Sequence, residues 1–269
     1  MPTFKIPKEY KCLVDLINFK ELGGESDALS RRASYWDNTI QIQVRIGNKS
    51  GIGSGLLLSN GFILTNYHVL NEQIKEAKAK LPQGITTNIT EICCTGLAYN
   101  ENKLDDIVLA RAKALKNYER KGIKLVKEQI PLGKKIRIYG FKHGDYVEED
   151  EGEKIKNPES NGFLNIFDSK INELFTDKNI FSNEINEDKY IGSTNAKTHI
   201  EEGWSGGPAI EIETGNLIGL NFREVKQHPT YTKKEDLAYY EIKTHQYVLT
   251  KRIISMIKHY LYSKREEIA

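Results

Sequence analysis

Short apolar runs separated by turn-forming residues fill most of the chain from Thr39 onward. Residues 40–46 alternate apolar and polar side chains with the period of two that is typical of a half-buried strand. Ser59-Asn60-Gly61 follows the next apolar run, and Asn-Gly favours the positive φ angles that a tight hairpin turn requires. This pattern predicts a chain built mainly from short strands.

The same reasoning predicts further strands at residues 89–98, 107–111, 136–140, 208–212 and 217–222, with a turn at 214–216. Two segments differ from this pattern. Residues 71–80 are rich in Glu, Gln, Lys and Ala and predict a polar helix, whereas Ile253, Ile257 and Leu261 recur at helical spacing and predict a C-terminal helix. Many short strands with one closing helix favour an all-β fold over alternating β-α-β units.

Two segments lack a clear periodic pattern. Residues 1–37 form a mixed opening segment, in which residues 12–17 could be a short strand or a helix. Residues 142–161 are rich in Glu, Lys and Gly without periodicity and predict an exposed loop. The mixed stretch at 163–190 supports no assignment.

The net charge of +2, from 39 Lys and Arg against 37 Asp and Glu, gives no electrostatic reason to expect a nucleic-acid or membrane partner. Three cysteines, Cys12 and the adjacent pair Cys93 and Cys94, cannot form a disulfide framework. No Cys-x-x-Cys or His-x-x-x-His spacing supports zinc, and we expect neither a metal nor a cofactor. Without a signal-peptide pattern or an apolar stretch of about 20 residues, the expected location is the reducing cytoplasm.

Three segments place a reactive side chain in an unusual context. Asn66-Tyr67-His68-Val69 follows an apolar strand, Asp106 opens another, and Ser205 lies in Gly203-Trp204-Ser205-Gly206-Gly207-Pro208. Glycines let the backbone turn sharply, so that the N–H groups of Gly203 and Ser205 could both point at one oxyanion. Such donors each stabilise a transition state by about 3–4 kcal/mol. A serine at this turn, with an imidazole to accept its proton, has the layout of an activated nucleophile.

Together these segments resemble the trypsin-like superfamily of serine proteases, and most of all its bacterial HtrA/Deg and glutamyl-endopeptidase branches. The likeness extends to the Gly-Ser-Gly strand, turn and Thr-Asn-x-His-Val stretch at residues 53–69, to 131–141 and to 215–221. It covers roughly residues 38–262, with 142–195 unaligned. The order His, Asp, Ser along the chain is also that of the family.

The resemblance implies two packed Greek-key β-barrels followed by a C-terminal helix. The implied divisions are an N-terminal extension over residues 1–37, a first barrel over 38–115, a second barrel over 116–244 with an insertion at 142–190, and a helix over 245–264. His68 would be the general base and acid, Asp106 would orient its ring, and Ser205 would be the nucleophile. Asp105 competes with Asp106, but the family places its acid directly before an Ile-x-Leu-type sequence, which favours Asp106.

The resemblance also suggests residues that contact the substrate. Leu220, Asn221 and Phe222 would form the strand edge that pairs with the substrate backbone. His199 lies where the family places the floor of its specificity pocket, and an imidazole cannot supply the fixed negative charge that selects Arg or Lys. His199, or Arg223 beyond the edge, could instead favour an acidic or polar side chain.

Trp204 departs from the family, which usually has Asp or Asn immediately before the serine. In the zymogen branch that Asp pairs with a newly cut N-terminus, and Trp204 has no carboxylate for such a pair. Activation by N-terminal trimming is therefore not expected. Trp204 either orders the oxyanion hole by packing against residues 142–190, or it fills a gap in the core.

The sequence thus favours a serine endopeptidase that hydrolyses protein or peptide substrates. A regulatory protein that touches residues 1–37 or 142–190 could control its activity. The alternative is a catalytically inactive trypsin-like domain that serves as a protein-binding module. All three triad positions are filled, which favours an enzyme.

Overall fold

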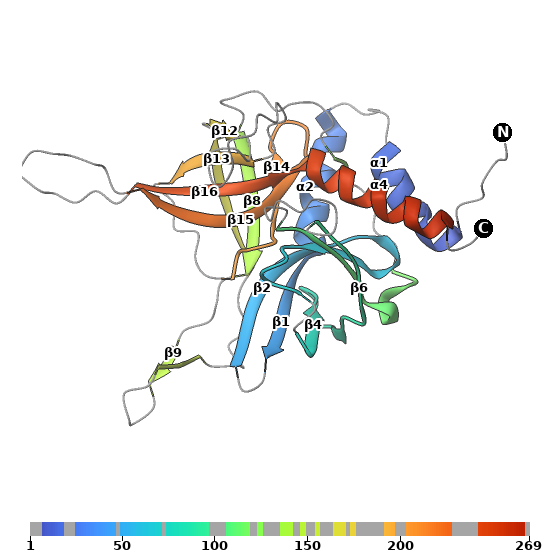
Figure 1. Cartoon of the computed structure of the whole chain (residues 1–269). Coiled ribbons are helices and arrows are strands. Elements are labelled where there is room, and N and C mark those ends of the chain that lie inside the picture. Colours follow the sequence, from blue (N-terminus) through green and yellow to red (C-terminus); the bar gives the residue numbers. More distant parts are fainter. Residues whose placement is uncertain are drawn as a thin grey trace, which may run out of the picture.

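The computed structural model describes residues 7–18, 25–46, 49–71, 74–96, 106–118, 123–125, 135–141, 146–148, 154–156, 164–170, 173–175, 191–196, 203–227 and 242–266. Within these ranges the chain forms two seven-stranded antiparallel sheets, a small two-stranded sheet and several helices. Figure 1 shows the first sheet below the second, with α1 (Lys11–Asn18) and α4 (Thr250–Glu266) beside them. This mainly β architecture with a C-terminal helix confirms the predicted fold class.

The first sheet has the strand order β5-β4-β1-β2-β3-β7-β6 among the described residues. Its strands are β1 (Thr39–Ile46), β2 (Lys49–Leu57), β3 (Phe62–Thr65), β4 (Glu76–Lys80), β5 (Thr86–Asn88), β6 (Glu91–Thr95) and β7 (Val108–Arg111). Asn60 and Gly61, in the short turn η2 (Ser59–Gly61) between β2 and β3, have φ angles of 61° and 75°. The Asn-Gly turn predicted from the sequence is therefore present.

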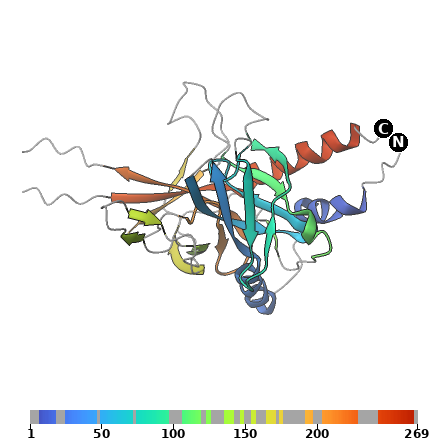
Figure 2. The same ribbon diagram turned by 90° about the horizontal axis from the view of Figure 1, so that it is seen from below.

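The second sheet has the order β11-β8-β14-β15-β16-β13-β12 in the part of the chain that the structure describes. Its strands are β8 (Lys135–Phe141), β11 (Leu164–Lys170), β12 (Glu173–Phe175), β13 (Ile191–Ala196), β14 (Pro208–Glu211), β15 (Leu217–Gln227) and β16 (Ile242–Leu249). Seen from below, the two sheets lie against each other with β15 and β16 projecting away from the first sheet (Figure 2). The small sheet pairs β9 (Tyr146–Glu148) with β10 (Lys154–Lys156).

Three expectations from the sequence need correction. Residues 76–80 form strand β4 and not part of a polar helix, because Ala77 and Ala79 pair with β1 and Ala79 is buried in the core. Strand pairing and burial here override a weak local helix propensity. The C-terminal helix begins at Thr250 and not at residue 245, because residues 242–249 pair with β13 and β15 as strand β16.

The third correction concerns the insertion predicted at residues 142–190. Its residues 164–170 pair with β8 along their whole length, so this stretch belongs to the wall of the second sheet. Residues 146–148 and 154–156 form the β9–β10 pair within the stretch predicted as a loop. Residues 173–175 of the insertion form β12, which pairs with β13 in the second sheet, and the other residues of the insertion lie outside the described ranges.

Buried side chains gather in two clusters among the described residues. One lies inside the first sheet and includes Ile40, Ile63 and Val108. The other joins the two sheets to the helices, with Leu64 from the first sheet and Ile210 from the second. Its helical members come from all three longer helices: Leu13, Leu16 and Ile17 from α1, Tyr35 from α2, and Ile253, Met256, Ile257, Tyr260 and Leu261 from α4. Burial of this apolar surface is the main force that holds the sheets together.

Helix α2 (Glu25–Asn38), within the opening segment, ties this segment to the second sheet. Arg31 Nε donates to the backbone oxygen of Thr214 at 2.7 Å, and Arg32 donates to that of Ile212 at 2.8 Å. The hydroxyl of Tyr139 on β8 donates in return to the backbone oxygen of Arg32 at 3.0 Å. Because α2 runs directly into β1, this helix connects both sheets.

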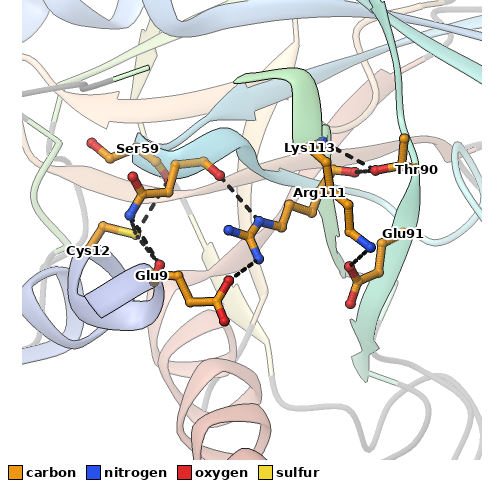
Figure 3. A network of polar contacts seen from close by, with 8 residues as sticks. Glu9, Cys12, Ser59, Thr90, Glu91, Arg111 and Lys113 are labelled. Atoms are coloured by element: carbon orange, nitrogen blue, oxygen red, sulfur yellow. Dashed lines mark hydrogen bonds and ion pairs between the residues drawn. The ribbon is translucent and has the colours of Figure 1, made fainter. Parts of the chain in front are cut away.

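The N-terminal residues dock on the first sheet through polar contacts, which Figure 3 shows from close by. Arg111 at the end of β7 donates to the carboxylate of Glu9 at 2.8 Å and lies over the ring of Phe62. The thiol of Cys12 lies 3.4 Å from the backbone oxygen of Ser59. Residues 12–17, left open between strand and helix by the sequence, lie in helix α1.

Candidate active site

His68 and Asp106 meet because their strands are neighbours in the first sheet. β3 ends at Thr65 and pairs with Val108, the first residue of β7, so the turn after β3 lies beside the residues before β7. The backbone N–H of His68 donates to Asp106 Oδ1 at 2.7 Å, and the ring Nδ1 of His68 contacts Oδ2 of the same carboxylate. The carboxylate therefore holds both the main chain and the ring of His68.

Asn66 adds a second link between the same two segments. Its side-chain nitrogen donates to the backbone oxygen of Asp106 at 2.7 Å. The Asp106 side chain is 14% exposed and the imidazole of His68 is 48% exposed. The carboxylate is thus sheltered, while the ring remains open to a reactant. Asp105, the competing acid in the sequence, lies outside the described residues.

The loop that carries Ser205 approaches both sheets so closely that its glycines have no room for a side chain. A Cβ on Gly206, whose φ is +85°, would lie 2.2 Å from the backbone oxygen of Ser54 and 2.3 Å from Thr65 Oγ1. A Cβ on Gly207 would lie 2.0 Å from the backbone oxygen of Tyr139 on β8. These two glycines let the loop pack between β2 and β3 on one side and β8 on the other.

Hydrogen bonds fix the backbone of this loop. The N–H of Gly206 donates to the backbone oxygen of Asn221 at 2.8 Å, and that of Gly207 donates to the oxygen of Trp204 at 3.0 Å. By contrast, the N–H groups of Gly203 and Ser205 donate to no backbone oxygen among the described residues. Gly203, with φ of 102°, adopts a conformation that favours glycine. These two N–H groups are the predicted oxyanion donors.

Gly206 packs against Thr65 and Asn66, so Ser205 lies near the end of β3. This strand ends at Thr65, three residues before His68 in the sequence. Within the described residues, no hydrogen bond joins the hydroxyl of Ser205 to the ring of His68. Hydrogen bonds between a nucleophile and its base are often long in structures without substrate and shorten in the reacting complex.

The side chain of Trp204 is buried, with 4% exposed, and its ring covers Gly140 of β8. A Cβ on Gly140 would lie 2.6 Å from a ring carbon of Trp204, so glycine at position 140 makes room for the ring. Trp204 thus supports the serine loop from the β8 side. The alternative that Trp204 packs against residues 142–190 stays a prediction, because most of that segment lies outside the described ranges.

The residues predicted to contact substrate have different outcomes. Leu220 pairs with Pro208 on one side and with Val248 on the other, and Asn221 exchanges backbone hydrogen bonds with the serine loop. The contact of Leu220 and Asn221 with a substrate backbone stays a prediction. Phe222 lies at an irregularity between β15 and β16 and is the first position beyond these pairings. His199 lies outside the described residues.

Ser54 is the site residue to which sequence reasoning gave no role. Its backbone N–H donates to the oxygen of Ser205 at 2.8 Å, and its hydroxyl donates to the oxygen of Gly203 at 2.7 Å. The Gly-Ser-Gly sequence at residues 53–55 was the available signal. Its target lies 149 residues further along the chain, so only the fold reveals the contact.

Among the described residues, no group of three or more His, Cys, Asp or Glu side chains is arranged to hold a metal ion. No helix in the described part of the chain combines the length and apolar character needed to cross a membrane.

Two packed antiparallel sheets, with a His–Asp pair from the first and a glycine-rich serine loop from the second, define a protein of the trypsin-like protease class. A model of the trypsin-like peptidase domain matches residues 53–220, more than half of the chain. The chain belongs to this family, as its sequence motifs predicted. No curated protein matches it significantly.

Several solved structures share the fold. The serine endoprotease from Yersinia pestis has 17% identity and a TM-score of 0.53, with 91% of this chain and 70% of that chain covered. The active form of the Rv3671c protease from M. tuberculosis has 15% identity and a TM-score of 0.56, with 89% and 91% covered. An HtrA-type protease with a tripeptide has 17% identity and a TM-score of 0.51, with 89% and 64% covered. At these identities the likeness is one of fold, and with the family it supports a protease function.

Proposed function

We propose that this chain is a serine endopeptidase that hydrolyses peptide bonds with Ser205, His68 and Asp106 through an acyl-enzyme. The observation that carries the proposal is the double contact of the Asp106 carboxylate with the backbone N–H and the ring Nδ1 of His68. An acceptor at Nδ1 fixes the tautomer whose Nε2 is free to take a proton. Family membership supports the same chemistry.

In the first step the Ser205 oxygen attacks the carbonyl carbon of the peptide bond, while His68 Nε2 takes the hydroxyl proton. The π electrons of the carbonyl move to its oxygen. The N–H groups of Gly203 and Ser205 stabilise this oxyanion, and the Asp106 carboxylate stabilises the imidazolium that forms. The tetrahedral intermediate collapses when the C–N bond breaks and the leaving amine takes the proton from His68.

The product of this step is an ester between Ser205 and the acyl half of the substrate. Water then attacks the ester carbon as His68 takes one proton from it. The C–O bond to Ser205 breaks, and the serine oxygen recovers its proton from the imidazolium. The enzyme returns to its starting state with no cofactor consumed.

The substrate backbone is proposed to lie along β15 beyond Asn221, as an added antiparallel strand. Support comes from the pairing pattern, since β14 pairs with β15 only up to Leu220 among the described residues. From Phe222 onward, the β14-facing edge of β15 pairs with no described strand. This edge therefore offers backbone donors and acceptors for β-augmentation.

For side-chain preference, we propose an acidic or polar residue before the cleaved bond, selected by His199 or Arg223. The support is chemical: neither side chain supplies the fixed negative charge that would attract Arg or Lys. A cleavage profile dominated by Arg or Lys at that position would refute this part of the proposal.

The setting is proposed to be the reducing cytoplasm, with activity controlled by a protein partner that touches the N-terminal extension or the 142–190 segment. The three cysteines are free thiols, as a reducing compartment would keep them. Residues 7–18 contact the first sheet and α2 contacts both sheets, so a partner that binds them could act on the serine loop.

The test is a cleavage profile on proteome-derived peptides with the wild type and with the Ser205→Ala and His68→Ala variants. The proposal expects new peptide termini with the wild type and none with either variant at matched concentration. Equal cleavage by Ser205→Ala would show a contaminating protease and contradict the assignment. A folded wild type that cleaves nothing, with or without cell extract, would favour the second candidate, a catalytically inactive binding module. The observation that favours an inactive binding module is that no hydrogen bond joins Ser205 to His68 within the described residues.

A further inference from the structure

Ser54 lies on β2 with no exposed surface, and all its polar groups take part in contacts around the serine loop. Its N–H donates to the backbone oxygen of Ser205 at 2.8 Å, and its hydroxyl donates to that of Gly203 at 2.7 Å. The same hydroxyl accepts from the N–H of Phe141 on β8 at 2.8 Å, and the backbone oxygen of Ser54 accepts from Thr65 Oγ1 at 2.7 Å. One small residue thus joins the first sheet, the second sheet and the serine loop.

These contacts determine how the peptide units of the loop are oriented. In a trans peptide the C=O and N–H groups point in opposite directions, so holding an oxygen also sets the direction of the N–H in the same unit. Ser54 holds the oxygens of Gly203 and Ser205, while Gly207 holds that of Trp204. The N–H of Ser205 shares a peptide unit with the Trp204 oxygen, which Gly207 holds. This unit lies between the two peptide units whose oxygens bond to Ser54.

The hydroxyl matters most at Gly203. Glycine has more backbone freedom than any other residue, and Gly203 has a φ of 102°. If the Ser54 hydroxyl were absent, the peptide unit of the Gly203 oxygen and the Trp204 N–H would be free to rotate. Such a rotation changes the backbone angles of Gly203 and Trp204, and with them the directions of the Gly203 and Ser205 N–H groups in the adjoining units. Those N–H groups are the donors assigned to the oxyanion, and they contribute only when they point at it.

We propose that Ser54 is a positioning residue of the active site, whose hydroxyl holds the serine loop in the form that binds an oxyanion. The proposal rests on the proposed serine-protease function and extends it to a residue that touches neither substrate nor reacting atoms. Through Phe141 the hydroxyl also makes the loop depend on the packing of β8 against β2. Loss of the hydroxyl reduces the rate of the chemical step more than it reduces substrate binding.

The decisive variant is Ser54→Ala, which keeps the Cβ and removes only the hydroxyl. It leaves the N–H of Phe141 and the oxygen of Gly203 without their partner, so some loss of stability is expected. The matched control is Thr39→Val, which removes another fully buried hydroxyl, bonded at 2.6 Å to the backbone oxygen of Tyr35 and distant in sequence from the loop. The control reproduces the structural cost without touching the serine loop.

The kinetic measurement is the hydrolysis of one peptide substrate by both variants. Ser54→Ala is expected to lower kcat by about 10²-fold, as small misplacements of catalytic groups do, with KM nearly unchanged. Thr39→Val is expected to lower the Tm but to keep the wild-type kcat. A Ser54→Ala variant that matches Thr39→Val in both Tm and kcat would overturn the proposal.

A second measurement keeps the test independent of activity. Hydrogen exchange of the Gly206 and Gly207 amides is expected to be about tenfold faster in Ser54→Ala than in Thr39→Val, since the loop loses one anchor. Equal exchange rates in the two variants would overturn the positioning role even in an inactive protein. A wild type without hydrolytic activity, together with faster exchange in Ser54→Ala, would refute the proposed function and leave the role of Ser54 in loop order supported.

Discussion

At the residue scale, the site depends on a few groups that cannot be exchanged for similar ones. Gly206 and Gly207 leave no room for a Cβ, because the backbone oxygens of Ser54 and Tyr139 occupy that space. Asp106 contacts His68 through both carboxylate oxygens, so an amide in its place would present a donor where the ring needs an acceptor.

Asp106→Asn is therefore expected to lower kcat by about 10⁴-fold, because the amide favours the wrong tautomer of His68. The fold should be unaffected, and KM should change little. The matched control is Glu91→Gln, which neutralises a carboxylate of the same sheet that pairs with Lys113 at 3.3 Å. Steady-state kinetics on both variants provides the measurement, and an Asp106→Asn enzyme within tenfold of the wild type would contradict the role of Asp106.

A second prediction concerns Cys93 on β6. Burial, with a smaller contribution from the nearby charge of Glu91, raises the pKa of the Cys93 thiol from 9.0 to about 12. The folded protein keeps this proton where the unfolded chain loses it. The resulting contribution to the free energy of unfolding is complete below pH 9 and is lost as the pH rises toward 12.

The measurement is the free energy of unfolding of the wild type and of Cys93→Ala at a series of alkaline pH values. The stability advantage of the wild type is expected to shrink between pH 9 and pH 12. A constant difference across that range would show that the thiol ionises alike in both states.

At the scale of elements, β8 supports the serine loop at successive residues. The oxygen of Tyr139 lies against Gly207, Gly140 lies under the ring of Trp204, and the N–H of Phe141 donates to Ser54. A strand holds such a row of contacts more rigidly than a loop would, which suits the proposed oxyanion site with its two aligned N–H groups.

Trp204→Ala is expected to destabilise the protein by about 3–5 kcal/mol. It is also expected to lower kcat, because Trp204 lies in the chain between Gly203 and Ser205, whose N–H groups are the proposed oxyanion donors. The control is Trp36→Ala, since Trp36 on α2 is 42% exposed and distant from the loop in sequence. Denaturant unfolding and peptide hydrolysis are the two measurements. Full activity in a destabilised Trp204→Ala variant would show that the ring only fills the core.

The sequence predicts a strand, helix or turn correctly where the local residues determine its conformation. It fails where contacts between residues distant in the chain determine it. Asn60 and Gly61 form their turn as expected, since the required φ angles follow from the residues themselves. Residues 76–80 resemble a helix until β1 pairs with them. The bonds of α2 to Ile212 and Thr214 connect residues about 180 apart in the chain, and no local pattern indicates them.

At the scale of the whole molecule, the candidate site exists only where the two sheets meet. The first sheet supplies His68 and Asp106, the second supplies the loop with Ser205, and Ser54 connects them. The helices α1, α2 and α4 share the buried cluster that spans both sheets. A disturbance that separates the sheets is therefore expected to disrupt the active site before it unfolds either sheet.

Ser205 is proposed to be a nucleophile that His68 activates. The most direct test is labelling of the folded protein with a fluorophosphonate, followed by digestion and mass spectrometry to locate the adduct. A single adduct is expected on Ser205 in the wild type, none in Ser205→Ala, and much slower labelling in His68→Ala. An unlabelled wild type across conditions and candidate activators, or labelling that persists in Ser205→Ala, would contradict this proposal.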